Sequence, residues 1–322
     1  MRFLIFALTL FSFAAFAAED YPLKLETRRD TEGFRVIAQN GGAAPVSVKA
    51  MLSEGKFVVA TPAFPLVTVI PPHSGPMQLA RIRGTKPGVR YSFHLEYRWA
   101  IGDYTASPRP DAPYRLPFED GLSFRIGQAP GGPITTHSSP ENRQAIDIPM
   151  PEGTPLVAAR EGVVVYTQTS QLYGAQNPEL LSRANEIRIL HEDGAITTYA
   201  HLAPNGVLVQ PGQRVSTGTR IGFAGSTGYS SGPHLHFAVH KLVQTADGFA
   251  IVSLPILFHV GNPAVLFAPR HGMIVSADYQ HPGMPPRLQA DGLQRIRPSS
   301  AGISNPGPRT PQAASASHWQ SD

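Results

Sequence analysis

The chain has 322 residues, enough for two domains of ordinary size. Hydrophobic residues make up 42% and charged residues 16%, a balance typical of a globular protein rather than a disordered one. The formal charge of +4 is small and the Lys and Arg residues are scattered, so the sequence has no basic stripe of the kind that binds nucleic acid. Because it contains no cysteine, disulfides and thiolate metal ligands are excluded, and any metal site must use His, Asp or Glu.

The first 17 residues predict a secretory signal peptide. Arg2 supplies a positive start, residues 3–13 are apolar, and Ala15-Phe16-Ala17 is an A-x-A cleavage site. The apolar run is too short to span a membrane, and no other stretch reaches the roughly 18 apolar residues of a transmembrane helix. We therefore expect an exported protein without a transmembrane segment, and the lack of a wall-anchoring motif favours the periplasm over the cell exterior. A buried N-terminal helix is the alternative.

Residues 18–126 predict an all-β accessory domain. In Tyr91–Trp99, aromatic or aliphatic residues occupy every second position, which is the period of a strand. Further segments of this kind are 34–38, 46–52 and 66–70. Turn residues recur at intervals that fit a β-sandwich of the immunoglobulin-like type, and the proline-rich stretch 106–117 reads as a linker or long loop. No cluster of chemically active groups falls in this half.

Residues 127–280 predict a second β-rich domain. Its strand candidates are 162–166, 186–190, 196–201, 220–224 and 234–240. A short helix within a loop is expected at 177–183, with Pro178 in its first turn. From residue 281 to 322 the composition shifts to Pro, Ser, Gln and Ala, so we expect a mostly disordered tail.

Two segments of this second domain carry histidines at strand spacing. His234 and His236 are separated by one residue, so on a strand they project from the same face. The four glycines in 222–232 predict a tight loop that leads directly onto that strand. By the same parity, Tyr199 and His201 are expected to share a face at the end of the strand 196–201.

An aspartate between aliphatic residues is the third signal. Asp147 lies between Ile146 and Ile148, and a buried carboxylate needs a metal or a hydrogen-bonded cation to offset its desolvation. The alternative is that Asp147 caps the turn at 152–154. His137 precedes it in the chain and adds a further imidazole. A catalytic zinc needs three protein ligands, an open position and a base, and without an H-E-x-x-H motif the best candidate for the base is a histidine.

Together these motifs resemble the lysostaphin/LytM-type peptidoglycan metallopeptidases. The resemblance covers roughly residues 128–280 and keeps the order of the family's motifs. Those motifs are His137…Asp147, Gly153-Thr154-Pro155, Ala158–Val164, Tyr199-Ala200-His201-Leu202, Gly225-Ser226-Thr227-Gly228 and Gly232–Phe237. The resemblance implies antiparallel sheets of the duplicated hybrid motif type, which form a groove with one zinc ion at its floor.

The resemblance also implies a role for each candidate residue. His137, Asp147 and His236 would bind the zinc, while His201 and His234 would activate water and stabilise the transition state. The commonest form of the first motif has its histidine four residues before the aspartate. Here that position is Arg143, whose guanidinium cannot bind a metal, and a longer variant of the motif matches His137 instead.

The sequence therefore predicts an exported zinc metalloendopeptidase that hydrolyses peptide bonds of peptidoglycan, in stem-peptide cross-links or bridges. One alternative is a non-enzymatic protein of the same fold that activates a cell-wall amidase. Another is a peptidoglycan-binding protein whose β-sandwich does the work. The sequence does not identify the bond that is cut, the task of the N-terminal domain or the oligomeric state.

Overall fold

The computed structural model describes residues 21–109, 111–281 and 288–289. Strands dominate, and the helical structure of these residues is one 3-10 turn, so the prediction of an all-β protein is confirmed. The predicted signal peptide lies outside the described residues, as does most of the predicted tail. Within the described part of the chain, no helix combines the length and apolar character that crossing a membrane requires.

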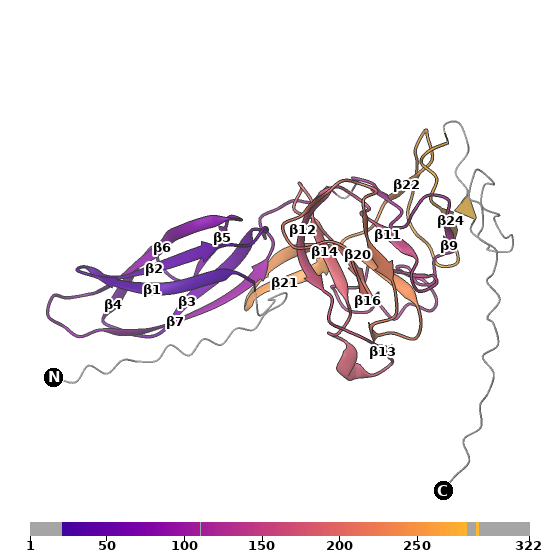
Figure 1. Ribbon diagram of the computed structural model, residues 1–322. Helices are drawn as coiled ribbons and strands as arrows, with labels where there is room; N and C mark the ends of the chain where they lie inside the picture. The colour runs from indigo at the N-terminus through magenta and orange to yellow at the C-terminus, as the bar shows by residue number, and fades with distance from the viewer. Residues whose placement is uncertain (1–20, 110, 282–287, 290–322) are drawn as a thin grey trace, which may run out of the picture.

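Seven N-terminal strands form two antiparallel sheets that pack face to face. The first sheet has the order β1 (Leu23–Asp30), β2 (Gly33–Asn40), β6 (Ser74–Gly84) and β4 (Val58–Thr61). The second has the order β5 (Leu66–Ile70), β3 (Val46–Lys56) and β7 (Ser92–Ile101). Alternate side chains of both sheets meet between them, and one of the buried clusters there includes Val36, Ile82, Ala50 and Leu95. These strands form the elongated lobe that is indigo and purple in Figure 1.

A larger sheet forms the base of the second lobe. Its order is β10 (Ile146–Pro149), β20 (His234–Thr245), β15 (Ile196–Ala200), β14 (Glu186–Leu190), β12 (Gly162–Gln168) and β17 (Arg214–Val215), and β21 (Gly248–Ser253) extends it by pairing with β20. All pairings in this sheet are antiparallel. The predicted strands 186–190 and 220–224 coincide with observed strands.

A three-stranded sheet covers one face of this base. Its order is β11 (Pro155–Val157), β18 (Arg220–Ala224) and β16 (Leu202–Val207). The core between the two sheets holds fully buried residues from each, and these include Ile148, Leu235, Phe237, Leu156 and Ile221. The opposite face of β10, β15 and β20 is left for the polar side chains of the site.

Short elements complete the second lobe. The parallel pair β13 (Gly174–Ala175) and β19 (Gly228–Tyr229) lies near the 3-10 turn η1 (Pro178–Leu180), whose N-cap is Asn177. Two small sheets have the orders β8 (Tyr114–Arg115), β22 (Phe258–Val260), β23 (Val265–Phe267), and β9 (Ser123–Arg125), β24 (Ile274–Ser276), β25 (Leu288–Gln289).

The chain between the lobes contains structure that the proline-rich composition did not predict. Strand β8 falls within the expected linker 106–117 and pairs with β22 of the second lobe. Strand β9 likewise pairs with β24. Leu116 and Phe118 are fully buried in the core of the second lobe. Residues 114–125 therefore pack with the second lobe, although they precede residue 127, where the sequence suggested that this domain begins.

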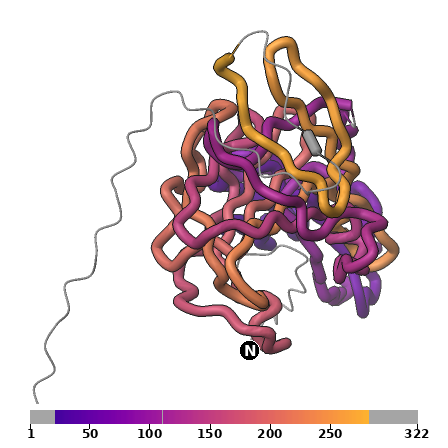
Figure 2. The backbone as a smooth tube through the Cα atoms, turned by 90° about the vertical axis from the view of Figure 1, so that its right-hand side faces the viewer, coloured from indigo at the N-terminus to yellow at the C-terminus, as the bar shows by residue number. Residues whose placement is uncertain are grey.

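The hairpin formed by β20 and β21 connects the two lobes. Leu242 and Ile251 of the hairpin pack against Ala100 of strand β7. Lys49 of strand β3 is buried, and its ammonium group donates a hydrogen bond to the backbone carbonyl of Ala246 at the hairpin turn. Figure 1 shows the sandwich lying against this part of the second lobe, and Figure 2 views the molecule with the second lobe toward the reader.

His191 gives the fold a pH-dependent contribution to its stability. It is buried, with Nδ1 2.7 Å from the carbonyl of Glu161 and Nε2 3.1 Å from the hydroxyl of Thr197. Burial, helped by the charge of Arg160, lowers its pKa from 6.5 to about 4. Between pH 6.5 and 4 the unfolded chain therefore binds a proton at His191 that the folded chain does not bind. The contribution of the neutral imidazole to the free energy of unfolding is complete above pH 6.5 and is lost as the pH falls from 6.5 to 4.

We predict that His191→Gln makes the free energy of unfolding depend less steeply on pH between 6.5 and 4. The slope should fall by an amount that corresponds to at most about one bound proton. Urea unfolding at a series of pH values measures this slope. His281→Gln, which removes an exposed imidazole, is the control and should retain the steepness of the unmodified chain. An unchanged slope for His191→Gln would contradict the assignment.

Candidate metal centre and active site

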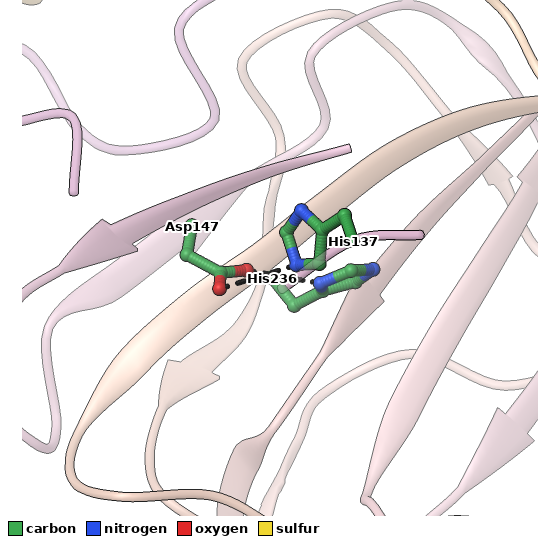
Figure 3. A group of neighbouring side chains, drawn as sticks. All are labelled: His137, Asp147 and His236. Atoms are coloured by element: carbon green, nitrogen blue, oxygen red, sulfur yellow. Dashed lines mark hydrogen bonds and ion pairs between the residues drawn. The ribbon is translucent and has the colours of Figure 1, made fainter. Parts of the chain in front are cut away.

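A cross-strand pair forms the centre of the site. In the antiparallel pairing of β10 with β20, Asp147 lies directly opposite His236. Their neighbours Ile146, Ile148 and Phe237 point into the core, so the two polar side chains project together from the other face. The carboxylate Oδ1 of Asp147 is 3.0 Å from Nδ1 of His236 (Figure 3). Asp147 does not act as the turn cap that the sequence left open, since its carboxylate contacts histidines.

His137 approaches the same carboxylate from a loop. Its Nε2 is 3.3 Å from Oδ2 of Asp147, and its Nδ1 is 3.3 Å from the backbone carbonyl of Ala145. A carbonyl only accepts hydrogen bonds, so Nδ1 carries a proton, and Nε2 faces the carboxylate, to which it donates when the ring is doubly protonated and beside which it offers a lone pair to a cation when it is not. Figure 3 shows His137 and His236 flanking the aspartate. One ligand atom from each of the three residues lies within 4.8 Å of the others.

This donor set fits zinc. Two imidazoles and one carboxylate are ligands that catalytic zinc uses, and three protein ligands leave a fourth position open. With ligand atoms about 2.0–2.1 Å from a tetrahedral zinc, neighbouring ligand atoms stand about 3.3 Å apart. The 3.3 Å from Nε2 of His137 to Oδ2 of Asp147 and the 3.0 Å from Nδ1 of His236 to Oδ1 are close to that value, each measured to its own carboxylate oxygen.

The ionisation of Asp147 favours a cation at this position. Burial by itself would raise the pKa of the carboxyl, but hydrogen bonds from His137 and His236 outweigh it and hold the pKa well below its usual range. Burial likewise acts to lower the pKa of His137, yet the hydrogen bond and charge of Asp147 outweigh this effect and leave that pKa raised. The carboxylate is therefore charged at neutral pH and needs positive charge beside it, which protons or a metal ion can supply.

His201 reaches the site by a route that strand parity did not predict. The strand β15 ends at Ala200, and His201 adopts the left-handed conformation with φ of 63°. Tyr199 is fully buried in the core, where its hydroxyl accepts a hydrogen bond from the amide of Ala159. The expectation that Tyr199 and His201 share a face is wrong, because the left-handed residue breaks the alternation and directs His201 to the side where His234 and His236 lie.

Backbone carbonyls orient both remaining histidines. Nδ1 of His201 is 2.7 Å from the carbonyl of Thr227, and Nδ1 of His234 is 2.8 Å from the carbonyl of Gly232. Each Nδ1 must therefore donate its proton, which leaves each Nε2 as an acceptor in the neutral form. The two rings lie with centroids 4.6 Å apart, and Nε2 of His234 is 4.0 Å from Oδ1 of Asp147.

The surroundings keep His201 neutral. Burial is the largest effect, and the charges of His234 and His236 add to it, so the pKa of His201 falls from 6.5 to about 4. At neutral pH the ring is consequently an unprotonated acceptor at Nε2. That is the state that a general base needs before it takes a proton.

A buried polar network supports His201, and sequence reasoning missed it. The side chain of Asn185 is fully buried and bonds to the backbone of Gln171 and Ala203. The backbone amide of Asn185 donates to the hydroxyl of Thr227 at 2.9 Å, and that hydroxyl donates to the carbonyl of Leu202 at 2.7 Å. Thr227 therefore fastens the glycine-rich loop to the residue that follows His201. The sequence places Thr227 in a motif, but a buried hydroxyl is recognisable only once the loop and strand are placed together.

The five candidate residues lie in one cavity of about 1110 Å³. Its lining also comes from the segment around η1, from the loop that carries His137 and from the start of β21. Leu181 and Tyr229 contribute exposed apolar surface to it. Arg143, at the position of the family's commoner ligand, is exposed on the loop.

We predict that Thr227→Val destabilises the protein by about 1–3 kcal/mol, because the change leaves the buried Asn185 amide and Leu202 carbonyl without their partner while preserving side-chain volume. Denaturant unfolding of the metal-free protein measures the effect. Thr245→Val, at the solvent-accessible end of β20, is the matched control and should change stability by less than about 0.5 kcal/mol. Equal effects of the two substitutions would contradict the role of this network.

The part of the chain that carries the site is similar in sequence to known proteins. Residues 141–248 match Peptidase family M23, and the match begins after His137. The chain is 39% identical over 105 residues to peptidoglycan DD-endopeptidase ShyA of Vibrio cholerae. This alignment covers 33% of this chain and 21% of that protein. It is 39% identical over 92 residues to DD-carboxypeptidase/endopeptidase Mpg of Neisseria meningitidis. This second alignment covers 29% of this chain and 18% of that protein. The chain thus spans about a fifth of the length of these relatives.

Among solved structures, the catalytic domain of lysostaphin from Staphylococcus simulans is 32% identical to this chain. The alignment covers 36% of this chain and 79% of that domain, with a TM-score of 0.28. The family match includes Asp147, His201, His234 and His236. The expected resemblance to the lysostaphin/LytM-type enzymes is confirmed over residues 141–248, the part of this chain that matches Peptidase family M23.

Proposed function

We propose that this chain is an exported zinc metalloendopeptidase that hydrolyses peptide bonds in bacterial peptidoglycan. The observation that carries the proposal is the cluster of His137, Asp147 and His236 with ligand atoms within 4.8 Å of one another, beside His201 and His234 in one cavity. The M23 domain and the relatives named as peptidoglycan endopeptidases support the peptidase activity and the substrate.

In this proposal His137, Asp147 and His236 hold a single zinc ion. When bound there, zinc supplies a Lewis acid for the scissile carbonyl and makes water acidic enough to react near neutral pH. The charged Asp147 offsets the charge of the ion, and the Ala145 carbonyl keeps the Nε2 lone pair of His137 directed at it.

His201 and His234 carry out the proton transfer and stabilise charge. Nε2 of His201, unprotonated at neutral pH, accepts the proton of the attacking water. The hydrogen bond from its Nδ1 to the Thr227 carbonyl holds the ring in place and stabilises the imidazolium that forms. His234, oriented by the carbonyl of Gly232, lies where the oxyanion develops and donates to it when its Nε2 carries a proton, while the proton that His201 took from water passes to the leaving amine. Since the rings are adjacent, either histidine can exchange protons with the same bound peptide.

Export by the signal peptide 1–17, residence in the periplasm and the division into an accessory domain 18–126 and a catalytic domain 127–280 belong to the same proposal. The alternatives are a regulator of an amidase and a wall-binding protein. Five of five residues expected for metal binding and catalysis are present and lie in one cavity, which favours the enzyme over a regulator without a metal.

We predict that residues 18–322 cleave purified sacculi and defined muropeptides, that a chelator stops the cleavage and that zinc restores it. The product masses identify the bond. Denatured protein repleted with zinc is the control for free metal. A wall-binding protein would instead remain on sacculi in the presence of chelator and release no fragments. Bound zinc without any cleavage would contradict the peptidase and favour the regulator.

We predict that His201→Ala lowers kcat about 10²–10⁴-fold, the usual contribution of a general base, while a single zinc stays bound. Muropeptide cleavage and metal analysis of the same preparation provide both values. His94→Ala on strand β7 of the sandwich controls for loss of an unrelated histidine and should retain activity. Full activity of His201→Ala with full zinc content would refute the assigned role.

A further inference from the structure

The metal ligand His137 lies on a loop with little internal support. Between His137 and Ala145 the backbone forms only local turns, with the amide of Asn142 bonded to the carbonyl of Ser139 at 3.0 Å and the amide of Ala145 to that of Asn142 at 2.8 Å. Most residues of this loop are exposed or only half-buried. A ligand binds tightly when its position is set before the metal arrives, so contacts from outside the loop must supply that order.

Two residues that face each other across β20 and β21 make such contacts. His240 and Ser253 are direct partners in the antiparallel register. Nε2 of His240 is 3.0 Å from the carbonyl of Glu141, and Oγ of Ser253 is 2.9 Å from the carbonyl of Pro140. The amide of Ser253 donates to that same Pro140 carbonyl at 2.9 Å. The pair therefore holds two consecutive peptide groups in the middle of the loop.

Further contacts fix the direction of each bond. The amide of Gln144 donates to Oγ of Ser253 at 3.0 Å, so this serine holds the loop at two points. Nδ1 of His240 is 3.1 Å from the hydroxyl of Thr198 on the neighbouring strand β15. Because the Glu141 carbonyl only accepts, Nε2 of His240 carries the proton and Nδ1 accepts from Thr198. Burial lowers the pKa of His240 to about 3, so the ring keeps this neutral arrangement at neutral pH.

The strand β20 links this contact to the metal centre. His234, His236 and His240 are at even spacing along the strand, so they project from the same face. His236 contacts Asp147 at one end of the row, and His240 contacts the His137 loop at the other. One rigid strand thereby sets the separation between His236 and the loop that presents His137.

We propose that His240 and Ser253 are positioning residues for the metal centre, which clamp the loop 137–145 so that His137 meets Asp147 and His236 in a geometry ready for zinc. The inference rests on the proposed zinc site. Their effect is on the affinity for the metal rather than on the reacting atoms.

The test compares zinc affinity of the full mature chain with that of three variants. His240→Leu fills the buried position with an apolar side chain and removes the hydrogen bond to the carbonyl of Glu141. In His240→Gln, the side-chain amide of the glutamine can still donate at the position of Nε2. The matched control is His191→Leu, since His191 is a buried histidine directly after strand β14 that also bonds a carbonyl and a threonine hydroxyl, but outside the cavity lining. Competition with a chromophoric chelator gives each dissociation constant for zinc.

We expect His240→Leu to weaken zinc binding about 10–100-fold, the usual cost of losing an outer contact of a metal ligand, and His240→Gln to recover most of it. His191→Leu should bind zinc as the unmodified chain does. In a His137→Ala background the His240→Leu substitution should have no further effect, since the loop then presents no ligand. Equal affinities for His240→Leu and the unmodified chain, or equal losses in His240→Leu and His191→Leu, would overturn the clamp.

Hydrogen exchange of the metal-free protein tests the clamp without any zinc. Amides of the peptide spanning 137–145 should exchange at least about tenfold faster in His240→Leu than in His191→Leu. Equal exchange would overturn the clamp even if zinc binds. If the unmodified chain binds no zinc while the loop is protected through His240, the proposed function fails and the clamp stands as a structural contact, so the two failures are distinguishable.

Discussion

The contact between Asp147 and His236 is the interaction on which the site depends. It is a cross-strand pair, so its geometry is set by the register of β10 against β20, and a slip of β10 by one residue would turn Asp147 into the core and away from His236. Ile146, Ile148, Leu235 and Phe237 prevent that slip because they fill the core on the other face. Burial of apolar side chains therefore fixes the position of the polar ones.

Around this pair the protein keeps four histidines in defined protonation states. Backbone carbonyls hold the Nδ1 protons of His137, His201 and His234, and that of Glu141 holds the Nε2 proton of His240. Burial lowers the pKa of His201 and His240, whereas the charge of Asp147 raises that of His137. Similar imidazoles thus become suited to ligation, to proton transfer or to a purely structural bond through what surrounds them.

Much of this arrangement was accessible from strand periodicity. The spacing of His234 and His236 and the apolar neighbours of Asp147 predicted which side chains share a face, and the structure has them so. Parity failed at His201, because one residue with a positive φ follows the strand and alternation holds only within regular structure. The linker expected from proline composition was wrong at β8, which lies in the stretch 106–117 and pairs with a strand more than 130 residues later in the chain.

By itself the sequence determined the all-β class, the face of each long strand and the set of histidines and aspartate that share one family's motifs, since these follow from local periodicity and residue chemistry. Only the tertiary structure decided how His137 reaches Asp147, which hydroxyl supports the loop beside His201 and where the two lobes join. Those contacts connect residues far apart in the chain, and loop conformation, burial and hydrogen-bond direction arise only when the strands are packed together.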